Sequence, residues 1–211
     1  MAINALGELS APERRRFAYL ALTGKLEGAV RDHLATWIQM NHGDAVLVGR
    51  DLSPAGFKLV GDGLKRALLD LVVVPRGDGA LEIVEAKQFY TFDYRVESPC
   101  LVTDLRQQII KDANRLRQAS LCRPGIVARL LLIACHITAI DPDPLYETVT
   151  KYKIHSDRRS RGADHSHDFA RGFEADDDLA HWTFESADSL ALGECFGYGV
   201  TLLPIIGKLR P

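Results

Sequence analysis

Apolar residues recur with a helical period over residues 10–41. Ser10-Ala11-Pro12-Glu13 has the pattern of a capping box with a proline in the first turn, and Asn41-His42-Gly43 ends the periodicity. Thr23-Gly24 can divide this stretch in two. The apolar positions are Leu20, Leu26, Val30, Leu34, Trp37 and Ile38. The chain is therefore expected to begin with one or two helices.

Short apolar runs separated by turn residues come next. Residues 45–48 and 57–60 predict short strands around a turn at residues 53–56. Residues 68–74 and 81–89 predict the two arms of a hairpin centred near Gly77. In that register, position 72 faces position 83 and position 70 faces position 85.

A second amphipathic helix is predicted to begin near Thr103 and to end at Arg123-Pro124-Gly125. Its buried stripe is Leu105, Ile109, Ala113 and Leu116. Residues 127–135 lack polar alternation, which favours a buried strand. The elements follow the order α-β-β-β-α-β, so we expect an α/β fold with a mixed central sheet flanked by helices.

The last third of the chain is less regular. Residues 141–180 mix charges with few apolar residues, which indicates a long mobile excursion, either an exposed loop or a flap that lays arginines on phosphates. His165, His167 and Asp168 lack a fourth spaced ligand for a metal site. Residues 181–211 are expected to return to the core as strands, with Pro204 favouring an edge or a bulge.

Two acidic residues stand out in the hairpin. Asp70 and Glu85 are predicted to face each other within strands that are otherwise apolar. Facing like charges destabilise a strand pair, and a bare buried carboxylate costs several kcal/mol. Mg²⁺ is a suitable bridge for two such oxygen ligands. Lys87 returns to the same strand face as Glu85, because side chains alternate with a period of two.

In Asp70 and Glu85-Ala86-Lys87 the chain resembles the PD-(D/E)XK, or restriction-endonuclease-like, nuclease superfamily over about residues 10–137. The proline of the motif is absent, since Leu69 precedes Asp70. The resemblance implies that Asp70, Glu85 and the Ala86 carbonyl hold Mg²⁺, for which Mn²⁺ can substitute. Lys87 would orient or deprotonate the attacking water, or stabilise charge in the transition state.

Two further positions are candidates through the resemblance. Glu27 lies on the apolar face of the first core helix, and it either reaches solvent at an edge or completes the metal site. Gln108, on the second helix, is the best functional candidate beside Gln107 and Lys111, although a solvated structural role suits all three. Asp112 stands where some members of the superfamily carry a tyrosine, so the Gln-x-x-x-Tyr pattern is not met.

Composition fits one soluble domain over residues 1–211. A hydrophobic content of 46% suffices for a core, and the net charge of −2 offers no global attraction to nucleic acid. Four cysteines without a C-x-x-C pair favour a reduced, cytoplasmic chain. Neither a signal sequence nor a membrane-spanning run is recognisable, so no membrane association is expected.

These features predict a Mg²⁺-dependent endo- or exonuclease that hydrolyses nucleic acid, with DNA as the expected substrate. Homodimers are frequent where both strands are cut, which favours a dimer. The alternative is a catalytically silent form of the same fold that binds nucleic acid or protein. Such a module could belong to a larger defence or mobile-element system.

Overall fold

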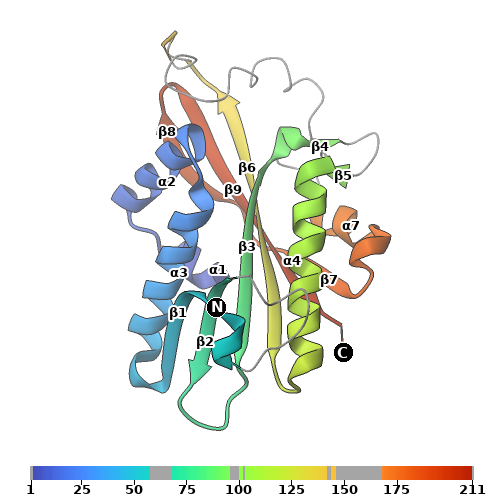
Figure 1. Cartoon of the computed structure of the whole chain (residues 1–211). Coiled ribbons are helices and arrows are strands. Elements are labelled where there is room, and N and C mark those ends of the chain that lie inside the picture. The colour runs from blue at the N-terminus through green and yellow to red at the C-terminus, as the bar shows by residue number, and fades with distance from the viewer. Residues whose placement is uncertain are drawn as a thin grey trace.

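The structure, a computed structural model, describes residues 2–57, 68–95, 100–101, 103–141, 144–145 and 168–210. In this part of the chain a seven-stranded mixed sheet has the order β1-β2-β3-β6-β9-β7, and β8 also pairs with β9 (Figure 1). Among the described strand pairs of this sheet, only β3 and β6 run parallel. The strands are β1 (Val46–Leu52), β2 (Leu69–Pro75), β3 (Glu82–Tyr90), β6 (Val127–Ala139), β7 (Trp182–Ser186), β8 (Leu190–Cys195) and β9 (Tyr198–Leu209). The mixed α/β class predicted from the sequence is confirmed.

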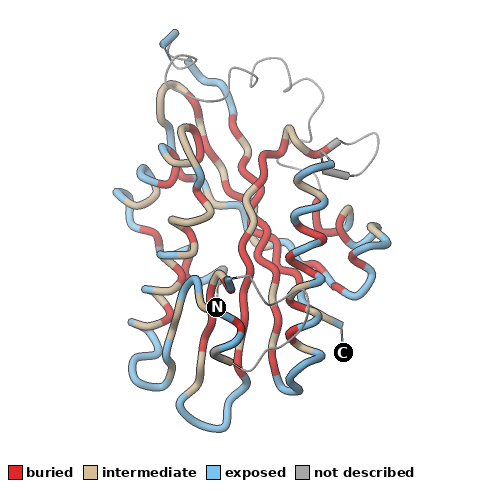
Figure 2. The backbone as a smooth tube through the Cα atoms, in the orientation of Figure 1, coloured by how far each residue is buried: buried red, intermediate tan, exposed pale blue. Residues whose placement is uncertain are grey.

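Helices cover both faces of the sheet and create two apolar layers (Figures 1 and 2). One face carries α1 (Ala2–Gly7), α2 (Ala11–Thr23) and α3 (Leu26–His42), and the other carries α4 (Thr103–Cys122) and α7 (Phe169–Glu174). The short elements are β4 (Tyr94–Arg95), β5 (Cys100–Leu101) and the 3-10 helices η1 (Gly43–Ala45), η2 (Pro54–Phe57), η3 (Thr91–Asp93) and η4 (Asp177–Leu179). None of the described helices is long and apolar enough to span a membrane.

The predicted pair of Val72 and Ile83 is confirmed, but the ladder ends at Leu71 and Val84, one position before the predicted pair of Asp70 and Glu85. Alternation along β3 then separates its side chains between the two layers. Ile83 packs in the layer beneath α4, and Val84 packs in the layer beneath α2 and α3. Glu85 and Lys87 share the parity of Ile83, so the hairpin presents both to α4.

The helical predictions also agree with the structure. The first stretch is divided at Gly24, whose N–H donates to the Leu20 carbonyl at 2.9 Å. At the start of α2, the backbone N–H and hydroxyl of Ser10 donate to Glu13 at 2.8 and 2.6 Å. These two hydrogen bonds lower the pKa of Glu13. The second amphipathic helix is α4, which begins at the predicted Thr103.

One local prediction is wrong. Phe57, expected to open a strand, ends the 3-10 helix η2, because the Pro54 turn continues as helix; residues 58–60 lie outside the described part. The prediction for Pro204 holds on one side of β9 only. Pro204 pairs with Ile133 of β6, whereas on its other side β7 pairs with residues 205–209 and β8 with residues 198–202. The Pro204 carbonyl accepts from the N–H of Ala187 in the connection between β7 and β8. The nitrogen of Pro204 therefore points into the gap between β7 and β8. Because neither strand pairs with residue 204, the lack of an N–H there costs no hydrogen bond between strands.

The predicted excursion over residues 141–180 is described only in part. Residues 146–167, including His165 and His167, lie outside the described residues. Asp168 caps α7 by accepting from the N–H of Arg171 at 3.1 Å. Farther along, Asp176 accepts two hydrogen bonds from Arg106 of α4, at 2.6 and 2.7 Å. The described end of this stretch, residues 168–180, is thus packed against the face of the sheet that carries α4.

The outer edge of β1 is covered by a side chain. Gln39 of α3 donates to the Val46 carbonyl at 3.2 Å and accepts from the Val48 N–H at 3.2 Å. One amide thereby forms the two hydrogen bonds that a neighbouring strand would form. This arrangement protects an edge that is otherwise open to strand pairing.

Candidate active site

The candidate site lies where β2 separates from β3. Their ladder ends at the pair Leu71 and Val84, so the next N–H groups of β3 need other acceptors. Asp70 accepts from the Ala86 N–H at 2.9 Å, and Glu27 of α3 accepts from the Gln88 N–H at 3.2 Å. Beyond the end of the ladder, the carboxylates of Asp70 and Glu27 therefore accept the hydrogen bonds from β3 that a neighbouring strand would otherwise accept.

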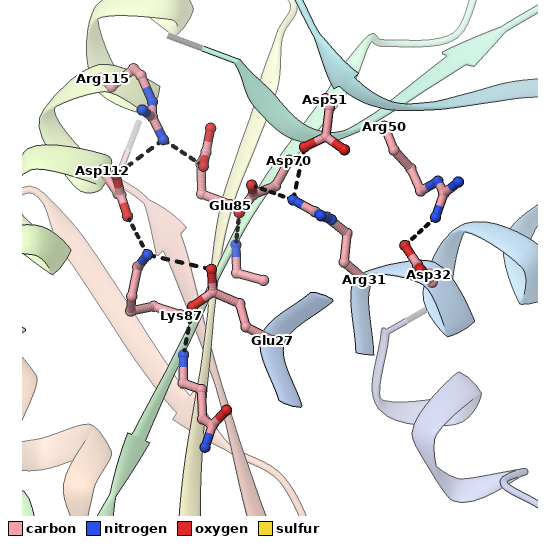
Figure 3. A network of polar contacts seen from close by, with 12 residues as sticks. Glu27, Arg31, Asp32, Arg50, Asp51, Asp70, Glu85, Lys87, Asp112 and Arg115 are labelled. Atoms are coloured by element: carbon pink, nitrogen blue, oxygen red, sulfur yellow. Dashed lines mark hydrogen bonds and ion pairs between the residues drawn. The ribbon is translucent and has the colours of Figure 1, made fainter. Parts of the chain in front are cut away.

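On the α4 side, Glu85 and Lys87 meet two charged residues of α4 (Figure 3). Arg115 lies 2.5 Å from Glu85 Oε2 and 3.0 Å from Asp112 Oδ1. Lys87 Nζ lies 3.4 Å from Asp112 Oδ2 and 3.5 Å from Glu27 Oε1. Lys87 thus connects a carboxylate of α3 with one of α4 across β3.

Asp70 has its own cation. Arg31 of α3 lies 3.0 Å from Asp70 Oδ1 and 2.9 Å from Asp51 Oδ1. Both oxygens of Asp70 are therefore engaged, one by Arg31 and the other by the Ala86 N–H. Asp51 has a positive φ of 51°, in a region that Asp tolerates better than most residues.

Burial and charge shift two pKa values in this cluster. Glu85 is only 1% exposed. Its burial, and secondarily the nearby Asp70 carboxylate, raise the pKa of Glu85 to about 8 despite Arg115. Burial alone would lower the pKa of Lys87, but the carboxylates of Glu27 and Asp112 raise it overall. Lys87 therefore keeps its proton at neutral pH.

Three polar atoms of the cluster are buried without a hydrogen-bond partner in the described structure: Glu85 Oε1, Arg31 Nε and Arg115 Nε. An unpartnered carboxylate oxygen beside a second carboxylate suits a hard cation such as Mg²⁺. Among the described residues, however, no three acidic, histidine or cysteine side chains are grouped closely enough to hold a metal as they stand. Glu85 Oε1 is open to a metal as it stands, whereas Asp70 could bind one only by giving up its contact with Arg31 or with the Ala86 N–H.

The structure brings together four of the predicted site residues, namely Asp70, Glu85, Lys87 and Glu27, beside the backbone of Ala86. Gln108 is exposed, and its side chain forms no hydrogen bond with the described part of the chain. One turn farther along α4, Asp112 makes the contact with Lys87 that Gln108 does not make. The Glu27 carboxylate contacts the β3 backbone and Lys87, while its side chain is still 27% exposed.

Sequence reasoning missed three members of the cluster: Arg31, Asp112 and Arg115. A signal existed for Asp112, which lies three residues after Ile109 and four before Leu116 of the buried stripe. A charged residue inside such a stripe requires a buried partner. Arg31 follows Glu27 by four residues and shares its helix face. Nothing in the spacing, however, assigns these cations to individual carboxylates.

The raised pKa of Glu85 makes stability depend on pH. Between its ordinary pKa of 4.5 and the native value of about 8, the folded chain keeps a proton that the unfolded chain releases. The free energy of unfolding should therefore fall as pH rises through this window, by at most about 1.4 kcal/mol per pH unit. Urea unfolding of the native chain and of Glu85→Gln at pH 5, 7 and 9 measures this slope. Equal slopes in both proteins would contradict the assignment to Glu85.

Comparisons with known proteins do not indicate a function for the chain. No family model, curated protein or solved structure matches the chain. The functional conclusion therefore depends on the cluster of Asp70, Glu85, Lys87 and Glu27.

Proposed function

We propose that the chain is a metal-dependent nuclease with a restriction-endonuclease-like core, and that DNA is its substrate. The observation that carries this proposal is the convergence of Asp70, Glu85 and Lys87 at the edge of β3 that β2 leaves uncovered. A homodimer in the cytoplasm is part of the same proposal.

Glu85 and Asp70 are the proposed metal ligands. Glu85 Oε1 is buried and unpartnered among the described residues, so it can accept a cation without breaking a hydrogen bond. The Ala86 N–H points to Asp70, and a strand residue directs its carbonyl to the same edge as its N–H. The Ala86 carbonyl is therefore the third proposed ligand. A bound Mg²⁺ or Mn²⁺ would neutralise charge on the phosphate and lower the pKa of a coordinated water.

Lys87 is proposed to act as a cation rather than as a base. Its ammonium is held between Glu27 and Asp112, and its pKa is raised by them. A protonated amine cannot take a proton from water, but it can donate hydrogen bonds to a nucleophile or to a phosphate oxygen. Glu27 and Asp112 thereby position the Lys87 ammonium at the edge of the site.

Calorimetric titration with Mg²⁺ and Mn²⁺ tests the proposed ligands. Native protein should bind either ion, and Asp70→Asn should weaken binding by at least about tenfold, because one anionic ligand is lost. Below pH 8, binding should also weaken with falling pH by up to about tenfold per unit, since Glu85 must release its proton. Asp32→Asn is the matched control, because Asp32 pairs with Arg50 outside the cluster.

A nuclease should also degrade plasmid, linear or single-stranded DNA when the metal is supplied. Native protein that binds metal but cleaves none of these substrates would count against the enzyme. Equal metal affinity in native protein and Asp70→Asn would reject the proposed ligands.

A second candidate is a catalytically silent module for nucleic-acid or protein binding. It is favoured by the internal neutralisation of the carboxylates, since Arg31 pairs with Asp70 and Arg115 with Glu85. A structural ion network of this kind needs no metal. Absence of Mg²⁺ and Mn²⁺ binding at pH 8, together with absence of cleavage, would favour this module.

A further inference from the structure

A second feature lies on the α2 face and shares no lining residue with the candidate active site. A hollow of about 670 Å³ is formed between the first turns of α2 and the turn that connects β8 with β9. Its polar lining includes Arg15 and Arg16, and its apolar lining includes Pro12, Tyr19 and Phe196. We refer to it as the α2 hollow.

Among the described residues, no acidic side chain pairs with the two arginines of the α2 hollow. The preceding Arg14 is held in place, because its guanidinium donates to the carbonyls of Leu9 and Gly7 at 3.0 and 3.3 Å. Arg15 and Arg16 are exposed, and neither guanidinium forms a hydrogen bond or an ion pair with the described part of the chain. Two adjacent guanidinium groups are thus free to bind an anion.

Aromatic rings form the other side of the hollow. Tyr19 is 48% exposed, and its ring centroid lies 6.0 Å from that of Phe196 at an angle of 51°. Phe196 has a φ of +54°, in the left-handed region that bulky residues rarely adopt. Glycine or asparagine would fit this turn position with less strain. Strained residues cluster at binding sites, and the retained Phe196 ring lines the hollow.

We propose that the α2 hollow binds single-stranded nucleic acid. Arg15 and Arg16 contact successive phosphates, while Tyr19 stacks on an unpaired base and Phe196 supports the Tyr19 ring. Basic groups beside exposed aromatic rings are the combination that single-strand binding requires, because every base has a face that can stack. An acidic peptide would use the arginines but gain nothing from the rings. This site involves none of the proposed catalytic residues, so either proposal can hold without the other.

Fluorescence anisotropy with a labelled oligothymidylate of about 12 nucleotides, in EDTA to prevent cleavage, tests the site. Native protein should bind with an affinity that falls with salt. The double variant Arg15→Ala/Arg16→Ala should bind at least about tenfold more weakly at low salt. Its plot of log affinity against log salt should be less steep by about 1.4, because each phosphate contact contributes about 0.7.

Stacking is tested separately. Tyr19→Ala should weaken binding about tenfold, whereas Tyr19→Phe should retain it, because the ring and not the hydroxyl is required. Phe196→Gly relieves the positive φ and should still weaken binding, so a loss there is not explained by a misfolded turn. Unchanged urea unfolding midpoints verify the fold of each variant.

The matched control is Arg117→Ala/Arg123→Ala, which removes the same charge from the opposite, α4 side of the sheet. This control should bind like native protein. Equal weakening in both double variants would overturn the proposal in favour of unspecific charge attraction. Native affinity in Tyr19→Ala, or equal competition by polyglutamate, would overturn it in favour of an acidic partner.

Discussion

Replacing Arg115 with methionine should lower the free energy of unfolding by about 3–5 kcal/mol above pH 8. Glu85 is ionised there, and Arg115 is its partner at 2.5 Å. Without that guanidinium, Glu85 would be a buried charge near the further carboxylates of Asp70 and Asp112. Below pH 6 the loss should be smaller, because Glu85 is already protonated. Urea unfolding at both pH values measures the difference.

Two controls separate this effect from a general loss of ion pairs. Lys208→Met breaks the Lys208–Glu185 pair, whose members are both largely exposed, and should scarcely change the unfolding midpoint. Glu85→Gln combined with Arg115→Met should be more stable above pH 8 than Arg115→Met alone, since the stranded charge is gone. A double variant no more stable than Arg115→Met would refute the role assigned to this pair.

Replacing Lys87 with methionine should reduce the metal-dependent cleavage of DNA by about a hundredfold to a thousandfold. The Lys87 ammonium contacts Glu27 and Asp112, and the proposed mechanism assigns it to the nucleophile or to a phosphate oxygen. Metal affinity should be retained or rise, because removing a positive charge from beside the carboxylates favours a second cation. Single-turnover cleavage at saturating Mg²⁺ distinguishes this from weakened metal binding.

Lys111→Met is the matched control for Lys87→Met, because Lys111 is exposed on α4 next to Asp112 and contacts none of the cluster. It should cleave like native protein. If Lys87→Met cleaved at the native rate with metal bound, Lys87 would have a structural role only.

The hairpin could be predicted from sequence because its signals are local. Its strands have a period of two around one turn, so the turn near Gly77 predicts the pair of Val72 and Ile83 that the structure shows. The ladder ends at Leu71 and Val84, one position before Asp70 and Glu85. Lys87 follows from the same alternation. The prediction for Phe57 failed because a short apolar run beside a proline turn does not distinguish a strand from a 3-10 helix.

The partners of the acidic residues could not be predicted, because they depend on how helices lie across the sheet. Arg31 of α3 and Arg115 of α4 come from opposite faces of the sheet. Arg31 pairs with Asp70 of β2 and Arg115 with Glu85 of β3, just past the end of the β2–β3 ladder. A resemblance based on the motif therefore favoured a metal as the cation. In the folded chain, Arg31 already provides the positive charge beside Asp70, and Arg115 provides it beside Glu85. For the same reason the sequence favours Gln108 as the functional residue of α4, whereas in the structure Asp112 of the same helix contacts Lys87.

The amide of Gln39 on the outer edge of β1 limits how copies of this protein can associate. A second chain could extend the sheet at β1 only by first displacing the hydrogen bonds to Val46 and Val48. Growth of a fibril templated on this strand is disfavoured accordingly. A symmetrical pair of subunits would have to meet through helices or through another edge of the sheet.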